Sequence, residues 1–133
     1  MITKEELRSI PGLHKSIQRD KEQLRFLHEK ATSLPSQLTG KEKVQSSHDN
    51  NAGKYIDAAV DLEKEIREKE LQLLDLQKEA AEFMNTIDAV LTRKVIRYRY
   101  MNCYNWDEIA TLLGYEVRWL QHLEYEATYK LDL

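Results

Sequence analysis

The last third of the chain carries side chains that can make specific contacts with the edges of DNA bases. Within "EVRWLQHLE", Arg118 can donate two hydrogen bonds to a guanine edge, and Gln121 can bond adenine in the same way. Val117 can touch the methyl group of thymine. Two further cations, Arg97 and Arg99, precede this stretch and are placed to bind phosphates, a contact that sets register without reading sequence. Both arginines are equally compatible with a purely solvated role.

No arrangement of residues points to catalysis or to a metal site. The histidines are scattered, without the paired spacing of metal ligands: His14, His28, His48 and His122. The sequence contains neither a glycine-rich phosphate loop nor a nucleophile–base constellation. Its single cysteine, Cys103, has no partner for an internal disulfide. We therefore expect no enzymatic activity, no catalytic or metal-binding residues and no cofactor.

Two helices joined by a tight turn are expected to position Arg118 and its neighbours. Asn105 is a good N-cap, and Glu108 three residues later completes a capping-box pattern at the start of "WDEIATLLG". Gly114 stands where the turn requires a left-handed residue or a close helix crossing. The positions that match a helix-turn-helix template are Ile109, Ala110, Leu113, Gly114, Leu120 and Leu123. We expect the second helix to span about residues 117–131.

The N-terminal two thirds are predicted to form a long helical arm. A first helix is expected over residues 3–31, then a Ser/Asn/Gly-rich loop over 32–53, then a long helix over 54–91. Apolar residues of the first helix fall at spacings of three and four, interrupted by Asp20: Ile10, Leu13, Ile17, Leu24, Leu27 and Ala31. The long helix carries a heptad seam, interrupted by Lys69: Ala59, Leu62, Ile66, Leu73, Leu76, Ala80, Phe83, Ile87 and Val90.

A heptad seam of this kind cannot be buried by one helix alone. The first helix can fold back antiparallel along it, or a second copy of the chain can pack against it. Because the seam is longer than the first helix, we expect a homo-oligomer, a dimer or higher, formed through the long helix. An intramolecular hairpin is the alternative. Lys69 either marks the end of the partner helix or sets the register.

Composition agrees with this organisation. Gly and Pro are scarce, with four and two residues, and charged residues make up 32% of the chain, a balance typical of long solvated helices. We predict an all-α fold, with a helical hairpin or coiled-coil arm over residues 1–91 and a helix-turn-helix unit over 92–133. No apolar run approaches the roughly 20 residues that cross a bilayer, and the N-terminus lacks a signal-peptide block, so we expect a cytoplasmic protein without membrane contact.

The C-terminal stretch resembles region 4 of bacterial sigma-70-type factors. The resemblance rests on "LTRKVIRYRYMNCYNWDEIATLLGYEVRWLQHLEYEATYKL": an Arg/Tyr-rich helix, "WDEIA", "LLGY", and a long last helix with Ala127 and Leu131. The whole chain is similar to a family of phage and prophage proteins of unknown function, which join a sigma-region-4-like C-terminus to an N-terminal helical arm. Their "VQSS"-like element falls at Val44 to Ser47. The sigma-like part covers about the last third of the chain.

This resemblance implies that the last helix lies in the major groove of double-stranded DNA. The base-reading positions of the sigma family correspond here to Val117, Arg118 and His122, with Trp119 and Gln121 beside them. The chain departs from the family at all three reading positions, where Arg, Glu and Gln are typical. We therefore expect a target other than an ordinary promoter −35 element.

Three residues around the reading positions have competing interpretations. Trp119 is expected to pack against a neighbouring helix rather than to face DNA. Glu116 replaces the usual Ser or Thr cap, and its carboxylate favours the helix dipole but repels phosphate. His122 is compatible with facing either DNA or solvent.

Residues and resemblance together predict a DNA-binding transcriptional regulator of phage or prophage origin that oligomerises through its long helix. The alternative is a protein-interaction module that docks on RNA polymerase or another transcription protein without sequence-specific DNA binding. That alternative is supported by the net charge of −3, the Tyr/Trp content and the few basic residues of the last helix. A third interpretation is a phage packaging-type subunit, which would assemble into rings.

Overall fold

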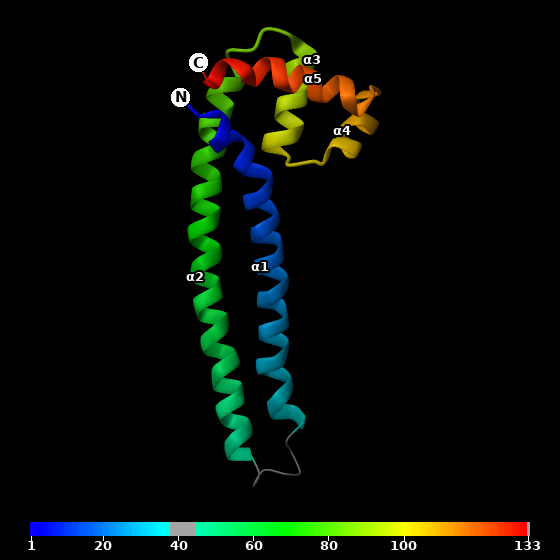
Figure 1. Ribbon diagram of the computed structural model, residues 1–133. Coiled ribbons are helices and arrows are strands. Elements are labelled where there is room, and N and C mark those ends of the chain that lie inside the picture. Colours follow the sequence, from blue (N-terminus) through cyan, green and yellow to red (C-terminus); the bar gives the residue numbers. More distant parts are fainter. Residues whose placement is uncertain (38–44, 133) are drawn as a thin grey trace. The chain divides into compact units, whose positions relative to one another are not determined.

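The computed structural model describes residues 1–37 and 45–132, and the predicted all-α fold is confirmed because every regular element in these ranges is a helix. A pair of long N-terminal helices is followed by a C-terminal helical unit (Figure 1). The helices are α1 (Lys4–Gln37), α2 (Gln45–Met84), α3 (Val90–Ile96), α4 (Trp106–Leu113) and α5 (Val117–Thr128). A π-helical segment, Arg97–Met101, follows α3 directly, and a 3-10 turn, Tyr129–Asp132, follows α5.

α1 begins at Lys4 because Thr3 caps it. The Thr3 hydroxyl accepts a hydrogen bond from the Glu6 amide, and the Glu6 carboxylate accepts one from the Thr3 amide, each 3.0 Å long. This reciprocal capping box satisfies two amides that a helix start leaves without intrahelical partners.

The predicted loop over residues 32–53 is wrong over most of its length. α1 continues to Gln37, and α2 already begins at Gln45. Ser, Thr and Asn each cost less than about 0.7 kcal/mol in a helix, so an established helix can extend through them even without an apolar stripe. The element predicted at Val44 to Ser47 lies only partly within the described residues.

Contacts within the chain group it into two compact units. One unit is Ser16–Glu70, and the other combines Met1–Lys15 with Leu71–Leu133. The first turns of α1 and the last turns of α2 therefore belong with the C-terminal helices, whereas the division predicted from the sequence falls after residue 91. The difference arises because N-terminal side chains contribute to the core of the C-terminal unit.

In the unit Ser16–Glu70, α1 covers the seam of α2. Ile17 and Leu27 of α1 and Ala59 and Ile66 of α2 are all buried. The hairpin accounts for the burial of this seam, and an oligomer stays a prediction.

The two polar interruptions of the predicted apolar stripes meet each other in this unit. Lys69 Nζ donates to Asp20 Oδ2 and to Ser16 Oγ, each at 2.7 Å. A second ion pair, from Lys21 to Glu70, lies beside them at 3.1 Å. A partly buried charge pair is satisfied only when its two members are opposite each other, so this pair fixes the register of the hairpin.

The core of the C-terminal unit is built from both ends of the chain. Its buried residues come from the N-terminus, the end of α2 and the α3 region: Ile2, Leu7, Ile10, Leu76, Ala80, Phe83, Met84, Ile96 and Tyr100. Leu13, Leu73 and Ile87 pack against this core from its edges. Ala127 and Leu131, at the end of α5 and in the turn after it, also contact the core.

α2 ends at Met84, earlier than the predicted residue 91. The Thr86 amide and the Thr86 hydroxyl both donate to the Phe83 carbonyl, at 3.0 and 2.6 Å. Such local bonds compete with the helical pattern and end the helix. Val90, predicted as the last seam residue, is 58% exposed, so the seam stops before it.

The predicted pair of short helices around a tight turn is present. Asn105 Oδ1 accepts a hydrogen bond from the Glu108 amide at 2.8 Å, and Glu108 Oε1 accepts one from the Asn105 amide at 2.9 Å, which confirms the capping box. Gly114 ends α4 in the left-handed conformation, with φ of 77°. A second small core holds the motif together, centred on the fully buried Val95, Ile109 and Leu120.

Candidate nucleic-acid interface

The start of α5 follows directly from the turn at Gly114. Glu116 is the N-cap residue in an extended conformation, and its carbonyl accepts from the amides of Trp119 and Leu120 at 3.1 and 3.2 Å. Its side chain makes no capping bond. The first turn of α5 therefore presents unpaired amides and a nearby carboxylate, which partly neutralises the positive end of the helix dipole.

One face of α5 is buried and the opposite face is open. Leu120, Glu124 and Thr128, each one turn apart, are 0–5% exposed. On the far side of the helix, Arg118 and His122 are exposed. Arg118 makes no hydrogen bond or ion pair with any residue that the structure describes, so its guanidinium can bind an external acceptor.

His122 shares the outer face with Arg118 but already has intramolecular partners. Its Nε2 lies 3.3 Å from Glu126 Oε1, one turn further along α5. Its ring also stacks on Trp119, with centroids 5.5 Å apart. Trp119 is 46% exposed, so the prediction that it packs against a neighbouring helix is wrong; its ring neighbour is on its own helix.

Gln121 shares a cavity with Arg8 and Pro11 of α1, and Val117 lies one turn before it on the same side of α5. At 100° per residue, the four predicted base-reading residues spread over an arc of about 140°. Gln121 is exposed and lines a cavity beside α5, whereas Val117 is half-buried. Arg118 and His122 therefore form one edge, and the other two residues form its flank.

The two arginines predicted to bind phosphate differ in their environments. Arg97 is exposed at the first position of the π-helical segment. Arg99 donates from Nη1 to the Tyr104 carbonyl at 3.0 Å, and its guanidinium lies 5.1 Å from the centroid of the Trp106 ring. Arg97 is thus available to a partner, whereas Arg99 already holds the loop before α4.

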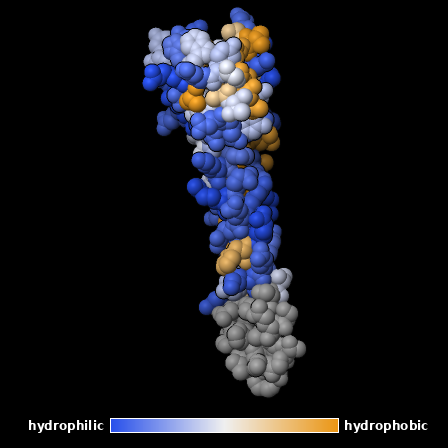
Figure 2. Space-filling view, turned by 90° about the vertical axis from the view of Figure 1, so that its right-hand side faces the viewer, coloured by the Kyte–Doolittle hydropathy of each residue, from blue (hydrophilic) through white to orange (hydrophobic). Residues whose placement is uncertain are grey.

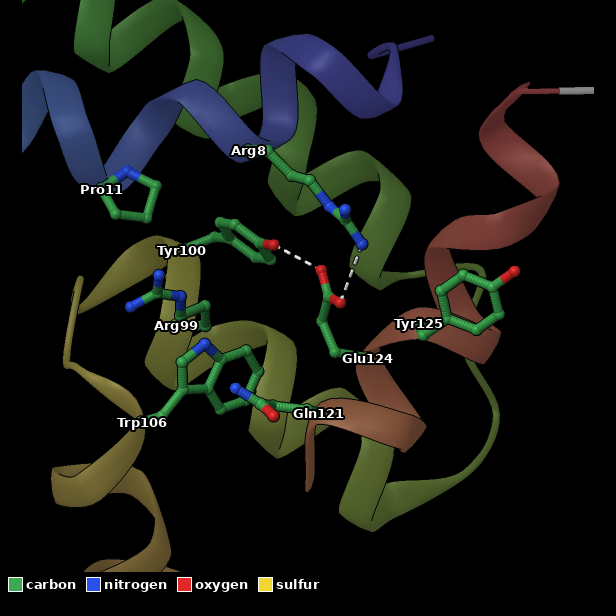
Figure 3. Close-up of a pocket in the computed structure, with 8 residues that line it drawn as sticks. All are labelled: Arg8, Pro11, Arg99, Tyr100, Trp106, Gln121, Glu124 and Tyr125. Carbon is green, nitrogen blue, oxygen red and sulfur yellow. Dashed lines mark hydrogen bonds and ion pairs between the residues drawn. The ribbon is translucent and has the colours of Figure 1, made fainter. Parts of the chain in front are cut away.

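A polar network that the sequence did not predict joins the buried face of α5 to α1 and to the π-helical segment. The Tyr100 hydroxyl donates to Glu124 Oε2 at 2.5 Å, and Arg8 Nη2 donates to Glu124 Oε1 at 3.2 Å (Figure 3). Burial, followed by the charge of Glu124, raises the pKa of Tyr100, so its hydroxyl stays protonated and keeps donating. Glu124 falls one turn after Leu120, a spacing that places a carboxylate on the buried face and was a readable signal.

A cavity of about 370 Å³ opens beside this network (Figure 3). It is lined by α1 through Arg8 and Pro11, by Arg99 and Trp106, and by α5 through Gln121 and Tyr125. The Tyr100–Glu124–Arg8 bonds close its inner wall.

The π-helical segment is held by a side chain from α2. Gln77 Nε2 donates to the carbonyls of Tyr100 and Met101, at 3.0 and 3.2 Å. The Asn102 amide closes the segment by bonding the Arg97 carbonyl at 3.1 Å. Cys103, which follows, has a φ of 57°, and burial raises the pKa of its thiol. A half-buried thiol whose pKa is raised is a poor nucleophile at neutral pH.

The exposed surface around α4 and α5 is aromatic and apolar as well as polar. Figure 2 shows apolar side chains gathered at the end of the molecule that carries the C-terminal helices. The large exposed side chains of α4, α5 and the residues directly after them are Leu112, Tyr115, Trp119, Tyr125 and Tyr129, each between 46% and 57% exposed. Glu116 and Glu126 lie among them, so this surface is not strongly basic.

No protein-family model, curated protein or solved structure gives a significant match to this chain. Within the described ranges no helix is both long enough and apolar enough to pass through a bilayer. Within the same ranges, no three His, Cys, Asp or Glu side chains gather as metal ligands would.

Proposed function

We propose that this protein is a DNA-binding transcriptional regulator of phage or prophage origin, which places α5 in the major groove. The observation that carries the proposal is the position of Arg118. It lies in the first turn of α5, the second helix of a pair joined by the turn at Gly114, and it is exposed and has no hydrogen-bond or ion-pair partner among the described residues. The N-terminal residues of such a helix are the ones that reach base edges. The proposal places the protein in the cytoplasm, where the DNA is.

The side chains on α5 supply the chemistry for recognition. Arg118 suits a bidentate bond to guanine, worth about 1–3 kcal/mol of discrimination. Gln121, on the flank, suits adenine, and Val117 suits a thymine methyl. His122 joins this edge when its contact with Glu126 opens.

Affinity on this proposal is modest and moderately dependent on salt. Arg97 is the exposed cation best suited to bind a phosphate. Arg99 can bind a phosphate only through those guanidinium N–H groups that do not donate to the Tyr104 carbonyl. About two or three phosphate contacts give a slope of roughly −2 to −3 in log affinity against log salt. Glu116 lowers affinity further by repelling the backbone.

Fluorescence anisotropy of a labelled random-sequence duplex, measured from about 50 to 200 mM salt, tests the proposal. The wild type should bind at low salt, and Arg97→Ala should reduce the salt slope by about 1. Arg19→Ala, an exposed arginine of α1, is the matched control and should leave binding unchanged. Absence of binding at about 50 mM salt, or an equal loss from the control, would contradict DNA binding.

A second candidate is docking on RNA polymerase or another transcription protein. The exposed Trp119 and Tyr115 beside the acidic Glu116 favour it, because aromatic side chains dominate protein interfaces and an acidic neighbour opposes DNA. Binding of purified RNA polymerase should then fall sharply in Trp119→Ala. Tyr129→Ala is the control, since Tyr129 is similarly exposed, at 49%, but lies beyond the end of α5.

A further inference from the structure

α2 carries a second apolar stripe that is separate from the seam covered by α1. Its large exposed apolar side chains are Ile56, Val60, Leu71 and Leu74, which are 52%, 56%, 64% and 50% exposed. The steps between them are four, eleven and three residues, which correspond to about one, three and one helical turns. All four therefore lie along one face of a single continuous helix. They form two apolar pairs, Ile56 with Val60 and Leu71 with Leu74, which lie about 16 Å apart along the helix.

The middle of this stripe holds one acid and one base. Glu63 and Arg67 follow Val60 at helical spacing and lie on the same face. Within the described part of the chain, neither side chain forms an ion pair or a hydrogen bond. The stripe is thus apolar at both ends and carries one negative and one positive side chain at its centre, both accessible to a partner chain.

Along the stripe the residues follow the order apolar, apolar, acid, base, apolar, apolar. This order pairs favourably with the same order in an antiparallel second copy. A two-fold axis near residue 65 places Ile56 opposite Leu74 of a second copy, and Val60 opposite Leu71 of that copy. In a symmetric dimer each contact occurs twice, so these pairs form four apolar contacts in all. A parallel arrangement also brings apolar side chains together, but it places Glu63 opposite Glu63 and Arg67 opposite Arg67, so like charges face each other.

The same axis aligns the charges. Glu63 of one copy falls opposite Arg67 of the other, and the reciprocal pair forms across the axis. We propose that α2 mediates an antiparallel homodimer through the stripe Ile56–Leu74, with two Glu63–Arg67 pairs between the chains at its centre. The partner surface is a second copy of this chain, because only the reversed stripe supplies both the apolar pairs and the charge pairs. This dimer uses a face of α2 other than the predicted seam, and it does not depend on DNA binding.

Sedimentation equilibrium of the full chain over a wide concentration range tests the proposal. The mass should approach twice the 15.7 kDa of one chain. Leu71→Glu should raise the dimer dissociation constant at least about tenfold, since both copies lose an apolar contact. Leu112→Glu is the matched control, because Leu112 of α4 is 57% exposed but outside the stripe, and it should leave the constant unchanged. Circular dichroism confirms that both variants keep their helices.

Charge reversal tests the orientation of the chains. Glu63→Arg alone and Arg67→Glu alone should each weaken the dimer, whereas the double reversal should restore it to within about threefold of the wild type. In a Cys103→Ser background, Val60→Cys with Leu71→Cys should form a disulfide-linked dimer, and Val60→Cys alone should not. A monomer at every concentration, a dimer insensitive to Leu71→Glu, or linkage by Val60→Cys alone would overturn the proposal.

Discussion

Substituting Tyr100 with phenylalanine removes a single hydroxyl from a side chain that is 2% exposed. That hydroxyl donates to Glu124 Oε2 at 2.5 Å, and Glu124 is itself 5% exposed, so water cannot easily replace the lost donor. A buried acceptor that loses its partner costs about 1–3 kcal/mol, and the charge of the carboxylate places the loss in the upper half of that range. We therefore expect Tyr100→Phe to lower the unfolding free energy of the C-terminal unit by about 2–3 kcal/mol at neutral pH.

Urea unfolding followed by the fluorescence of Trp106, in a Trp119→Phe background, reports on this unit. Trp106 contacts Arg99 and lines the cavity that the network closes. Tyr104→Phe is the matched control, because no hydrogen bond from the Tyr104 hydroxyl occurs within the described residues, and it should change stability by less than about 0.5 kcal/mol. A Tyr100→Phe loss as small as that of the control would refute the role assigned to the network.

Alkaline pH provides an independent check on the same network. Burial and the charge of Glu124 raise the pKa of Tyr100 in the folded chain above the ordinary value of about 10. Above pH 10 the unfolded chain therefore holds fewer protons than the folded chain, so stability falls as pH rises, by up to about 1.4 kcal/mol per pH unit. Tyr100→Phe lacks this loss, and its deficit relative to wild type should shrink above pH 10. A deficit that stays constant would contradict the shift.

Three further predictions concern elements that position the site. Gly114→Ala should cost about 1–2 kcal/mol because φ is 77°, whereas Gly12→Ala within α1 should stabilise by about 0.5–1 kcal/mol. Neither added Cβ meets an atom of the described residues within 4 Å, so thermal unfolding isolates the backbone effect. Equal signs for the two changes would contradict it. Asn105→Ala should cost about 1 kcal/mol in urea unfolding through the lost capping box, and a neutral result would show that α4 does not need its cap. Asp20→Leu should lower the unfolding free energy of the hairpin in urea, because it leaves the charge of Lys69 without its partner. Adding Lys69→Leu should restore that free energy. If it does not, the pair does more than satisfy two partly buried charges.

The sequence predicted the short helices better than the long ones. Asn105 and Glu108 form a local capping box, and Gly114 forms a local turn, so three or four neighbouring residues contain the whole signal. The limits of α1 and α2 were misjudged because Ser- and Asn-rich segments only weakly disfavour a helix that is already formed. The capping box at Thr3 and Glu6 is an equally local signal that was overlooked.

The contacts of the site were less predictable because they join residues far apart in the sequence. Arg8 and Glu124 are separated by almost the whole chain, and nothing in either segment indicates the other. Asp20 and Lys69 were each recognised as an interruption of an apolar stripe, yet their pairing follows only from the register of the hairpin. Arg99 was predicted as a phosphate ligand from its type and position, but its bond to the Tyr104 carbonyl depends on the path of the π-helical segment.

Selection of duplexes from a randomised pool, carried out in parallel with wild type and Arg118→Ala, tests most directly whether the exposed edge of α5 reads DNA. We expect the wild type to enrich a short motif that contains at least one guanine. The Arg118→Ala variant should enrich the same motif with that guanine relaxed, at a cost of about 1–3 kcal/mol in affinity for the wild-type motif. Enrichment of no motif by the wild type, or of an unchanged motif by the variant, would contradict base reading by this helix.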